Sequence, residues 1–553
     1  MAKRTWLLVL SLVLFSASCR HSSAPLPAGQ AAGLSSGRSS NLSPGPFFSE
    51  KIAVYPDPVT YDLAIDVDYD SGSLSAVCRL TVKNPGAEPV TVVPLNLYRL
   101  MEVASVSDGS GKPLEFGQRV SIFEDWREFQ VNHVRVKMNP PLAPAASATL
   151  VIRYGGPLLG YAEAMQYVKD RVDKDMTLIR SDSLAIPEIG IPSWRENRAR
   201  GLKNYDYTVS VTVPAPLVVA NGGRLVSRTE SKGRATYTYA SKVPSWRIDL
   251  AISDYEILET ADAGLKVFAL PADKEGGRDL LERLTAVLEL YGRWFGPLKS
   301  FHGLTVIEIP AGCGSQADAA AIIQEAGAFK DPSKRYTFYH ELSHLWNVAA
   351  NDPLPCRFES EGLAMLLQHL AEEDLDGKSG AAEKAVSQSL VRLGKNFTEH
   401  PAWKAVPMIA YGEKDLTDLS YRMGQVFFYL LRESLGEKAF LDVVGGFIRE
   451  FSATGATTRR FVEYVKERSN VSLGRLFDEW VFTAEAAELV ASGTSLASFV
   501  ERYRSAEERR SARALIPSER FAIVAPCRRL RESTESTVSW PSASPICASS
   551  SKA

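Results

Sequence analysis

The sequence has few cysteines, few histidines and no excess charge of either sign, and each shortage excludes a class of protein. Six cysteines in 553 residues are too few and too scattered for a disulfide scaffold or a cysteine-based zinc module. The 63 Lys+Arg are matched by 65 Asp+Glu, without a basic block. Because nucleic-acid binding requires clustered Lys and Arg, we expect no nucleic-acid partner. The 45 % hydrophobic and 23 % charged residues are ordinary for a globular protein of two or three domains.

The first 19 residues have the pattern of an export signal. Lys3 and Arg4 precede an apolar run over 6–15, and small residues at 16–18 precede Cys19. This run is too short to span a bilayer, which needs about 20 apolar residues, so residues 1–19 are predicted to be a signal peptide. Small residues directly before a cysteine resemble the bacterial lipoprotein signal, in which the cysteine is lipidated. Simple secretion is the alternative, because that signal usually has an aliphatic residue where Ser16 stands.

Residues 20–46 contain 15 Ser, Gly and Pro among 27 residues and no acidic residue. Such a composition cannot bury enough apolar surface to fold, so it predicts a flexible linker. We therefore expect an exported protein of the bacterial cell envelope that is tethered to a membrane through lipidated Cys19. Without lipidation the protein would be periplasmic or extracellular.

The next region, residues 47–257, is predicted to be an antiparallel β saddle or sandwich. Apolar residues alternate with polar ones over 61–69, 207–213 and 246–252, which is typical of half-buried strands. Asn221-Gly222-Gly223 predicts a hairpin turn. Frequent Pro and Gly between the expected strands favour hairpins over βαβ units.

Beyond residue 257 the period becomes helical, as in 277–296, with a β-like run at 304–309. Several helices are expected up to about residue 490, so the fold class is a multidomain α+β protein. Residues 258–490 would form a mainly α domain. The Ser-rich segment 491–553 shows no sustained period and is predicted to be a tail.

The segment 340–344 reads His-Glu-Leu-Ser-His and is the strongest chemical signal in the chain. Asp331 as an N-cap and Pro332 in the first turn predict the start of a helix, and Asn-Asp-Pro at 351–353 predicts its end. Residues four apart share a helix face, so both imidazoles can bind one ion beside the glutamate. Zinc suits imidazole and carboxylate ligands. The alternative is a pair of core histidines next to a solvated glutamate.

A third metal ligand must come from another element. The segment 357–361 opens a second apolar helix, and on spacing alone Glu359 and Glu361 are both candidates. Either carboxylate could instead be favoured there by the helix dipole alone.

HELSHLWN followed by SEGLA resembles the gluzincin metallopeptidases, chiefly the M1 aminopeptidase family. The resemblance implies that His340, His344 and Glu361 bind one zinc ion (Zn²⁺) and that Glu341 is catalytic. Sixteen residues separate His344 from Glu361, two fewer than in that family. The Trp-Asn pair that follows His344 is similar to the His-x-Trp-Asn motif of the M61 branch.

The segment from Asp415 to Trp480 also resembles the M1 family. Its Tyr421 matches the tyrosine that stabilises the transition state, and Met423 stands where the family usually has Lys. From residue type alone, three other tyrosines could take this role, namely Tyr336, Tyr339 and Tyr411. The resemblance covers roughly residues 55–485 and implies an N-terminal saddle domain followed by a thermolysin-like catalytic domain.

Substrate anchoring is where this chain departs from the M1 pattern. In that family the glutamate of Gly-x-Met-Glu-Asn, on an edge strand, binds the free amine of the substrate. Here residues 314–318 read Gly-Ser-Gln-Ala-Asp, which places Ala317 at the glutamate position. Asp318 or Glu325 could replace that carboxylate. Gly314 could let a substrate backbone approach and pair with the strand at 304–309.

The sequence therefore predicts a zinc metallopeptidase that resembles M1 aminopeptidases and cleaves short peptides. Zinc would activate a water molecule, Glu341 would take its proton, and Tyr421 would stabilise the negative charge that develops on oxygen. The alternatives are an endopeptidase or other peptidase that does not need a free N-terminus, and a non-catalytic, zinc-binding lipoprotein. Cys313 and Cys356 flank the site and would be either a disulfide or free buried thiols.

Overall fold

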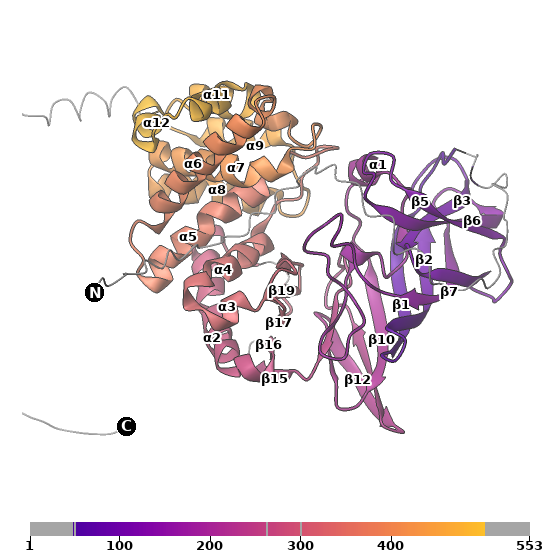
Figure 1. Ribbon diagram of the computed structural model, residues 1–553. Helices are drawn as coiled ribbons and strands as arrows, with labels where there is room; N and C mark the ends of the chain where they lie inside the picture. The colour runs from indigo at the N-terminus through magenta and orange to yellow at the C-terminus, as the bar shows by residue number, and fades with distance from the viewer. Residues whose placement is uncertain (1–47, 49–50, 261–263, 299–300, 504–553) are drawn as a thin grey trace, which may run out of the picture. The chain divides into compact units, whose positions relative to one another are not determined.

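The computed structural model describes residues 48, 51–260, 264–298 and 301–503 (Figure 1). The predicted signal peptide with Cys19, the predicted linker and residues 504–553 lie outside these ranges. Within the described residues, no helix is both long and apolar enough to cross a bilayer.

Three sheets make up the N-terminal region (Figure 1). The largest has the order β12 (Arg224–Ser231), β13 (Arg234–Ala240), β10 (Asp206–Pro214), β1 (Asp57–Asp68), β2 (Ser73–Lys83), β7 (Ser147–Pro157) and β4 (Glu102–Asp108). A second sheet has the order β5 (Phe116–Ile122), β6 (Gln130–Leu142), β3 (Val90–Tyr98) and β9 (Glu188–Ile189). The third has the order β11 (Val218–Ala220), β14 (Leu250–Ser253) and β8 (Thr177–Ile179), and the short helix α1 (Trp194–Ala199) lies between β9 and β10 in the chain.

The predicted alternation is confirmed in β1 and β10. In β1, Tyr61, Leu63, Ile65 and Val67 are buried while the residues between them are exposed, because successive side chains of a strand point to opposite faces. The residues of β10 alternate in the same way.

Three details of the β prediction are wrong. β1 and β10 pair in parallel, so the large sheet is mixed. Asn221-Gly222-Gly223 is not a hairpin turn, because it joins β11 to β12 and these strands lie in different sheets. The Asn221 side chain stabilises this connection between two sheets, because it accepts a hydrogen bond from the Tyr207 hydroxyl and donates one to the Asp249 carbonyl. Of the run 246–252, only Leu250 onward forms a strand, and all four residues of β14 are buried.

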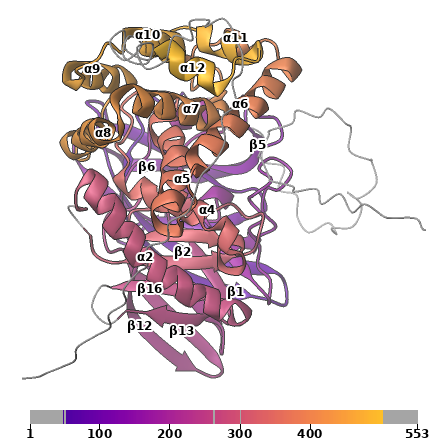
Figure 2. The same cartoon turned by 90° about the vertical axis from the view of Figure 1, so that its left-hand side faces the viewer.

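A five-stranded sheet opens the second region, in the order β15 (Glu256–Glu259), β16 (Leu265–Ala269), β17 (Leu304–Ile309), β19 (Ala321–Glu325) and β18 (Gln316–Ala317). The helices are α2 (Lys274–Phe295), α3 (Gly327–Lys330), α4 (Tyr336–Ser343), α5 (Leu363–Asp376), α6 (Ala381–Glu399), α7 (Thr417–Leu435), α8 (Glu437–Phe451), α9 (Thr458–Arg468), α10 (Gly474–Phe477), α11 (Glu485–Ala491) and α12 (Leu496–Tyr503). α2 packs along β16 (Figure 2). It buries the apolar face that the 277–296 pattern predicts.

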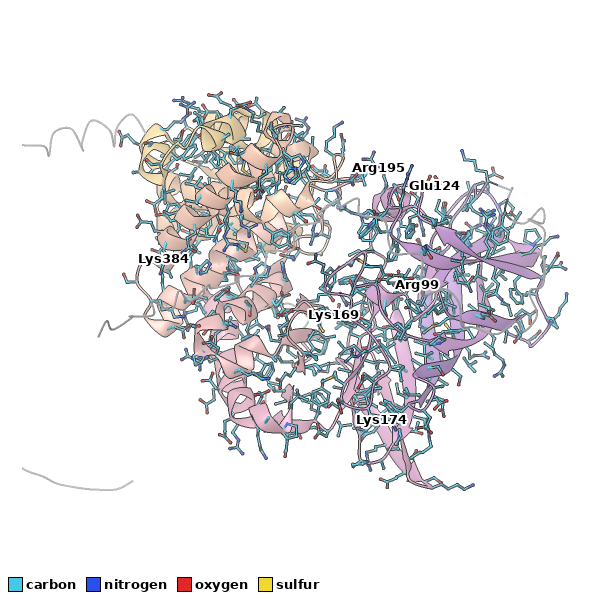
Figure 3. All side chains as sticks on the ribbon, viewed as in Figure 1. Arg99, Glu124, Lys169, Lys174, Arg195 and Lys384 are labelled. Atoms are coloured by element: carbon cyan, nitrogen blue, oxygen red, sulfur yellow. The ribbon has the colours of Figure 1, made fainter. Side chains whose placement is uncertain are left out.

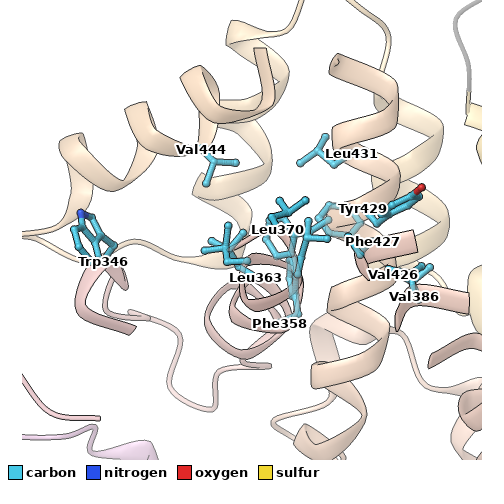
Figure 4. Packing of buried hydrophobic residues seen from close by; sticks show 14 of the residues in the cluster. Trp346, Phe358, Leu363, Leu370, Val386, Val426, Phe427, Tyr429, Leu431 and Val444 are labelled. Carbon is cyan, nitrogen blue, oxygen red and sulfur yellow. The ribbon is translucent and has the colours of Figure 1, made fainter. Parts of the chain in front are cut away.

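The helices share one core, in which α5 and α7 are central (Figure 4). Leu363 and Leu370 of α5 and Phe427 and Leu431 of α7 are among its buried members. A Cβ atom added to Gly362, immediately before α5, would lie 2.4 Å from the Cα of Gly424 in α7. Glycine is therefore required for the close approach of these two segments.

The helical domain continues past residue 490, where the sequence predicted a tail. In α12, Phe499 is fully buried, and the Trp480 indole donates a hydrogen bond to the Tyr503 hydroxyl. Arg502 forms an ion pair with Glu479 at 2.7 Å. The buried residues of α12, namely Leu496, Phe499 and Tyr503, span only two helical turns, which is too short for a sustained periodic signal in the sequence.

Candidate metal centre and active site

The helix of the His-Glu-x-x-His motif is shorter than predicted. Asp331 caps a 3₁₀ turn (Pro332–Lys334), as its side chain accepts from the Ser333 N–H, and α4 begins only at Tyr336. The α-helix ends at Ser343, and a 3₁₀ turn that begins at His344 continues it to Trp346. The two histidines still lie on one face, with ring centroids 4.9 Å apart.

His340, His344 and Glu361 form a group that could hold a metal ion, with ligand atoms all within 4.8 Å of one another. The Oε2 atom of Glu361 lies 3.4 Å from His340 Nε2 and 3.5 Å from His344 Nε2. Two ligands of a tetrahedral zinc ion with bonds of about 2.0–2.1 Å are separated by about 3.3 Å. The donor set and its spacing therefore fit zinc.

Glu359, the other candidate ligand, lies elsewhere. Its Oε2 atom accepts from the Cys356 thiol at 3.8 Å, and burial raises the pKa of its carboxyl to about 7. Glu361 is on a π-helical turn (Phe358–Gly362) that leads into α5. A π turn has one residue more than an α turn, and such turns are frequent at functional sites.

Side chains hold the outer nitrogen atoms of both imidazoles. His340 Nδ1 is 3.1 Å from the Gln368 side-chain oxygen, and His344 Nδ1 is 2.9 Å from the Asn347 amide. These bonds leave Nε2 of each ring to face Glu361, as a metal site requires. Gln368 was not among the predicted site residues, although it follows Glu361 by seven residues, which is two helical turns on one face.

Arg357 is a second residue that the sequence analysis did not assign. Its backbone is left-handed, with φ of 68°, and its guanidinium forms an ion pair with Glu361 Oε1. Burial opposes ionisation of Glu361, but Arg357 and His344 outweigh it and hold the pKa of this carboxyl well below its usual range. Glu361 is therefore a carboxylate whose other oxygen faces the two histidines.

Glu341 is a buried carboxyl, 9 % exposed, whose side chain has no hydrogen-bond partner among the described residues. Burial raises the pKa of Glu341, and His340 and His344 act in the opposite direction. Its oxygen atoms are not among the fully enclosed, unpartnered atoms of the described residues, so water can reach them. Its carboxyl lies close enough to the two histidines for both to act on its pKa.

Tyr421 of α7 lies over the same site. Its ring is stacked on that of His340, with centroids 6.4 Å apart and planes 6° apart. Burial, reinforced by Glu361, raises the pKa of Tyr421, so its hydroxyl keeps the proton and can donate it in a hydrogen bond. The Arg357 guanidinium lies 5.8 Å from the ring centroid.

The alternative tyrosines have other surroundings. The Tyr339 hydroxyl is 3.2 Å from both carboxylate oxygens of Asp376. Tyr411 is fully buried, and its hydroxyl has no hydrogen-bond partner among the described residues. Tyr336 stacks on His369 at 5.4 Å.

The strand predicted to pair with a substrate, residues 304–309, is not at the edge of the sheet. β17, residues 304–309, lies between β16 and β19, so it cannot pair with a substrate. The free edge belongs to β18, which carries Gln316 and Ala317.

The three predicted substrate residues have partners within the chain. The Ser245 hydroxyl donates to Asp318 Oδ2 at 2.7 Å, and the Gly314 N–H donates to Glu325 Oε1 at 2.6 Å. Gln316 of the edge strand accepts from buried Arg247 at 2.7 Å. Substrate binding by these residues stays a prediction. Cys313 and Cys356 are buried free thiols, so they form no disulfide.

Solved structures of similar shape exist, although neither a family model nor a curated protein matches the sequence. An M1 zinc metallopeptidase from Deinococcus radiodurans aligns over 79 % of this chain and 95 % of its own, with 20 % identity and a TM-score of 0.56. A mutant of the M1 zinc metallopeptidase from the same organism, bound to a Tyr-Ser-Ala substrate, aligns over 77 % and 94 %, with 19 % identity and a TM-score of 0.57. The chain has the two-domain fold of the M1 zinc metallopeptidases. The predicted gluzincin fold, a β-rich domain followed by a helical domain, is thereby confirmed.

The M1 fold explains why distant segments of this sequence meet at one point. α4 supplies His340 and Glu341, the 3₁₀ turn that continues it supplies His344, the π turn before α5 supplies Glu361, and α7 supplies Tyr421. These are the three helices that the shared core holds together.

Proposed function

We propose that this chain is a zinc-dependent peptidase that hydrolyses short peptides. The observation that carries the proposal is the convergence of His340, His344 and Glu361 beside Glu341, a buried carboxyl without a partner. A zinc ion held by these three ligands would polarise a peptide carbonyl. It would also lower the pKa of a water molecule, so that the water could give up a proton and attack that carbonyl. A purely structural metal site would have no use for the unpartnered carboxyl.

The residues of this chain have separate roles in the proposed reaction. Glu341 takes the proton of the attacking water and delivers it to the leaving amine. The Tyr421 hydroxyl donates a hydrogen bond to the oxygen of the scissile carbonyl as negative charge develops there. Arg357 holds the outer oxygen of Glu361, so that only the inner oxygen faces the metal position.

The substrate class follows from the length of peptide that the neighbouring structure holds, which is a tripeptide. Aminopeptidase action on such peptides is the first candidate. Ala317 on the edge strand β18 favours a second candidate, a peptidase that does not require a free N-terminus, because a buried ammonium needs a carboxylate partner.

One assay tests the function and separates the two candidates. Purified protein with zinc is given matched tripeptides with free and acetylated N-termini, with and without a chelator. We expect chelator-sensitive cleavage, and cleavage of the acetylated peptide would reject a strict aminopeptidase. Glu341→Gln should lower kcat by about 10²–10⁴-fold while zinc remains bound. An active Glu341→Gln variant would contradict the mechanism.

We also propose that the protein is exported and anchored through lipidated Cys19, on the pattern of its first 19 residues. Cys19→Ala should move the protein from the membrane fraction to the soluble fraction of the cell envelope. An unchanged distribution would contradict anchoring.

A further inference from the structure

A chain of hydrogen bonds leads from the outer nitrogen of His340 along α5 to a residue just beyond the end of that helix. His340 Nδ1 is 3.1 Å from Gln368 Oε1, and Gln368 Nε2 is 2.9 Å from His369 Nε2. His369 Nδ1 is 2.6 Å from Glu372 Oε2, and the Lys378 ammonium donates to Glu372 Oε1 at 2.6 Å. The proposed reaction assigns no role to His369 or Glu372.

Glu372 fixes the direction of these hydrogen bonds. Burial opposes ionisation of Glu372, but hydrogen bonds from His369 and Lys378 outweigh it and lower the pKa of this carboxyl. A carboxylate can only accept hydrogen bonds, so His369 Nδ1 is the donor. A neutral imidazole carries one N–H, which leaves a lone pair on Nε2. His369 Nε2 therefore accepts, and the NH₂ group of Gln368 donates to it.

This direction decides which end of the Gln368 amide faces the metal ligand. The two ends of an amide have nearly the same shape but opposite hydrogen-bonding roles, so its neighbours determine its orientation. With its NH₂ group bound to His369, Gln368 presents its oxygen to His340. His340 Nδ1 then donates, and the lone pair of the neutral ring is on Nε2, the atom that lies 3.4 Å from Glu361 Oε2.

The reverse orientation of the amide would oppose metal binding. The NH₂ group would then face His340 Nδ1, which would have to accept, and the proton of the neutral ring would be on Nε2. A protonated Nε2 has no lone pair for zinc. Within the part of the chain that the structure describes, the buried Gln368 side chain has hydrogen bonds only to His340 and His369. Its orientation therefore depends on His369.

The ring of His369 is itself held in place. It stacks on the ring of Tyr336 of α4, with centroids 5.4 Å apart and planes 28° apart, and its side chain is only 14 % exposed. The hydrogen bonds of an imidazole lie in the plane of the ring, so this stacking does not compete with the bonds to Glu372 and Gln368.

We propose that His369 is a positioning residue for the metal site, because it holds the Gln368 amide in the orientation that leaves Nε2 of His340 free to bind zinc. This inference rests on the proposed zinc-dependent function and extends it to a residue outside the group of three ligands. It also gives Glu372 a role, since this carboxylate sets the tautomer of His369.

Zinc affinity in two backgrounds tests the proposal, with dissociation constants of the full chain measured by competition with a chelator. His369→Phe keeps a ring that can stack on Tyr336 but offers no acceptor, and we expect it to weaken zinc binding about 10-fold. Gln368→Glu places a carboxylate beside His340, and both oxygens of a carboxylate accept, so no orientation has to be selected. Adding His369→Phe to Gln368→Glu should therefore cause no further loss of affinity.

A merely structural role for His369 would give a different result. Equal losses of affinity in the two backgrounds, or no loss in His369→Phe, would overturn the proposal. Glu372→Gln should also weaken zinc binding, because an amide at this position can donate as well as accept and no longer dictates the tautomer of His369. If His369→Phe does not fold, Glu372→Gln replaces it in the same comparison, alone and together with Gln368→Glu.

Two control variants match these changes. His400→Phe makes the same substitution at an exposed histidine, which stacks on Trp403. Lys384→Gln removes an exposed charge from α6 (Figure 3). Both should bind zinc as tightly as the unaltered protein, and a 10-fold loss in either would overturn the assignment to His369. If the unaltered protein binds no zinc, the proposed function fails, whereas a zinc site that is insensitive to His369 rejects this inference alone.

Discussion

The β-rich region and the helical region differ in how much of their structure is encoded locally. In the β region, alternation along 61–67 determines which side chains are buried, but the parallel pairing of β1 with β10 depends on contacts far apart in the sequence. In the helical region, the spacing of His340 and His344 alone places both imidazoles on one face. Chemistry that depends on short spacing is therefore easier to recognise from sequence than topology.

The largest effect is expected from His340→Ala. Removal of one of three ligands should abolish zinc binding at micromolar metal and with it all peptidase activity, measured by metal analysis of the dialysed protein. Leu63→Ala, in the core of the β region, is the matched contrast. It should lower the free energy of unfolding by about 2–5 kcal/mol without changing zinc content. Loss of zinc in Leu63→Ala would show that the metal site is not locally encoded.

Tyr421→Phe removes only a hydroxyl and tests the residue that comes from a third helix. We expect kcat to fall by about 10²–10³-fold, as for loss of one oxyanion donor, with KM and zinc content nearly unchanged. Steady-state kinetics on one tripeptide measures this. An unchanged kcat would assign the role to another residue, and Tyr336→Phe is the control.

Gln368→Ala should have a smaller effect, and on metal affinity rather than on chemistry. Loss of the bond to His340 Nδ1 should weaken zinc binding by about 10- to 100-fold, measured by competition with a chelator. Gln368→Glu keeps an acceptor at this position and should retain most of the affinity. If Gln368→Ala binds zinc as tightly as the unaltered protein, then α4 alone orients the imidazole.

The smallest effect concerns stability at the end of the helical domain. Burial opposes ionisation of Glu479, but hydrogen bonds from Arg502, Tyr503 and Arg475 outweigh it and lower the pKa of Glu479 to about 2. The pKa of an unfolded glutamate is about 4.3, so this stabilisation is present above about pH 4.3 and is lost as the pH falls toward 2.

Glu479→Gln should therefore cost about 1–3 kcal/mol of unfolding free energy at pH 7 and less at pH 3. Chemical denaturation at the two pH values measures the difference. If Glu479→Gln lowered the free energy of unfolding equally at both pH values, packing rather than the charge of Glu479 would hold α12 in place.

The predictions agree with the structure for short local motifs. They differ where the structure depends on how segments far apart in the sequence pack on one another. Capping by Asp331 was recognised correctly, but the cap starts a 3₁₀ turn, because tertiary contacts set where α4 begins. Spacing could not separate Glu359 from Glu361, and only the resemblance to M1 peptidases did. The contact between α6 and α7 was not predictable, because the bond from Ser389 to Gln425 sets its register and no local rule connects those two residues.

The π turn that carries Glu361 fixes the azimuth of this side chain about the axis of α5. Each residue of an α-helix advances about 100°, so an ordinary turn over the same residues would point the carboxylate away from the histidines. The extra residue of the π turn thus determines whether α4 and α5 can both supply ligands to one metal ion. A deletion within 358–362 could leave every ligand in the sequence and still separate them.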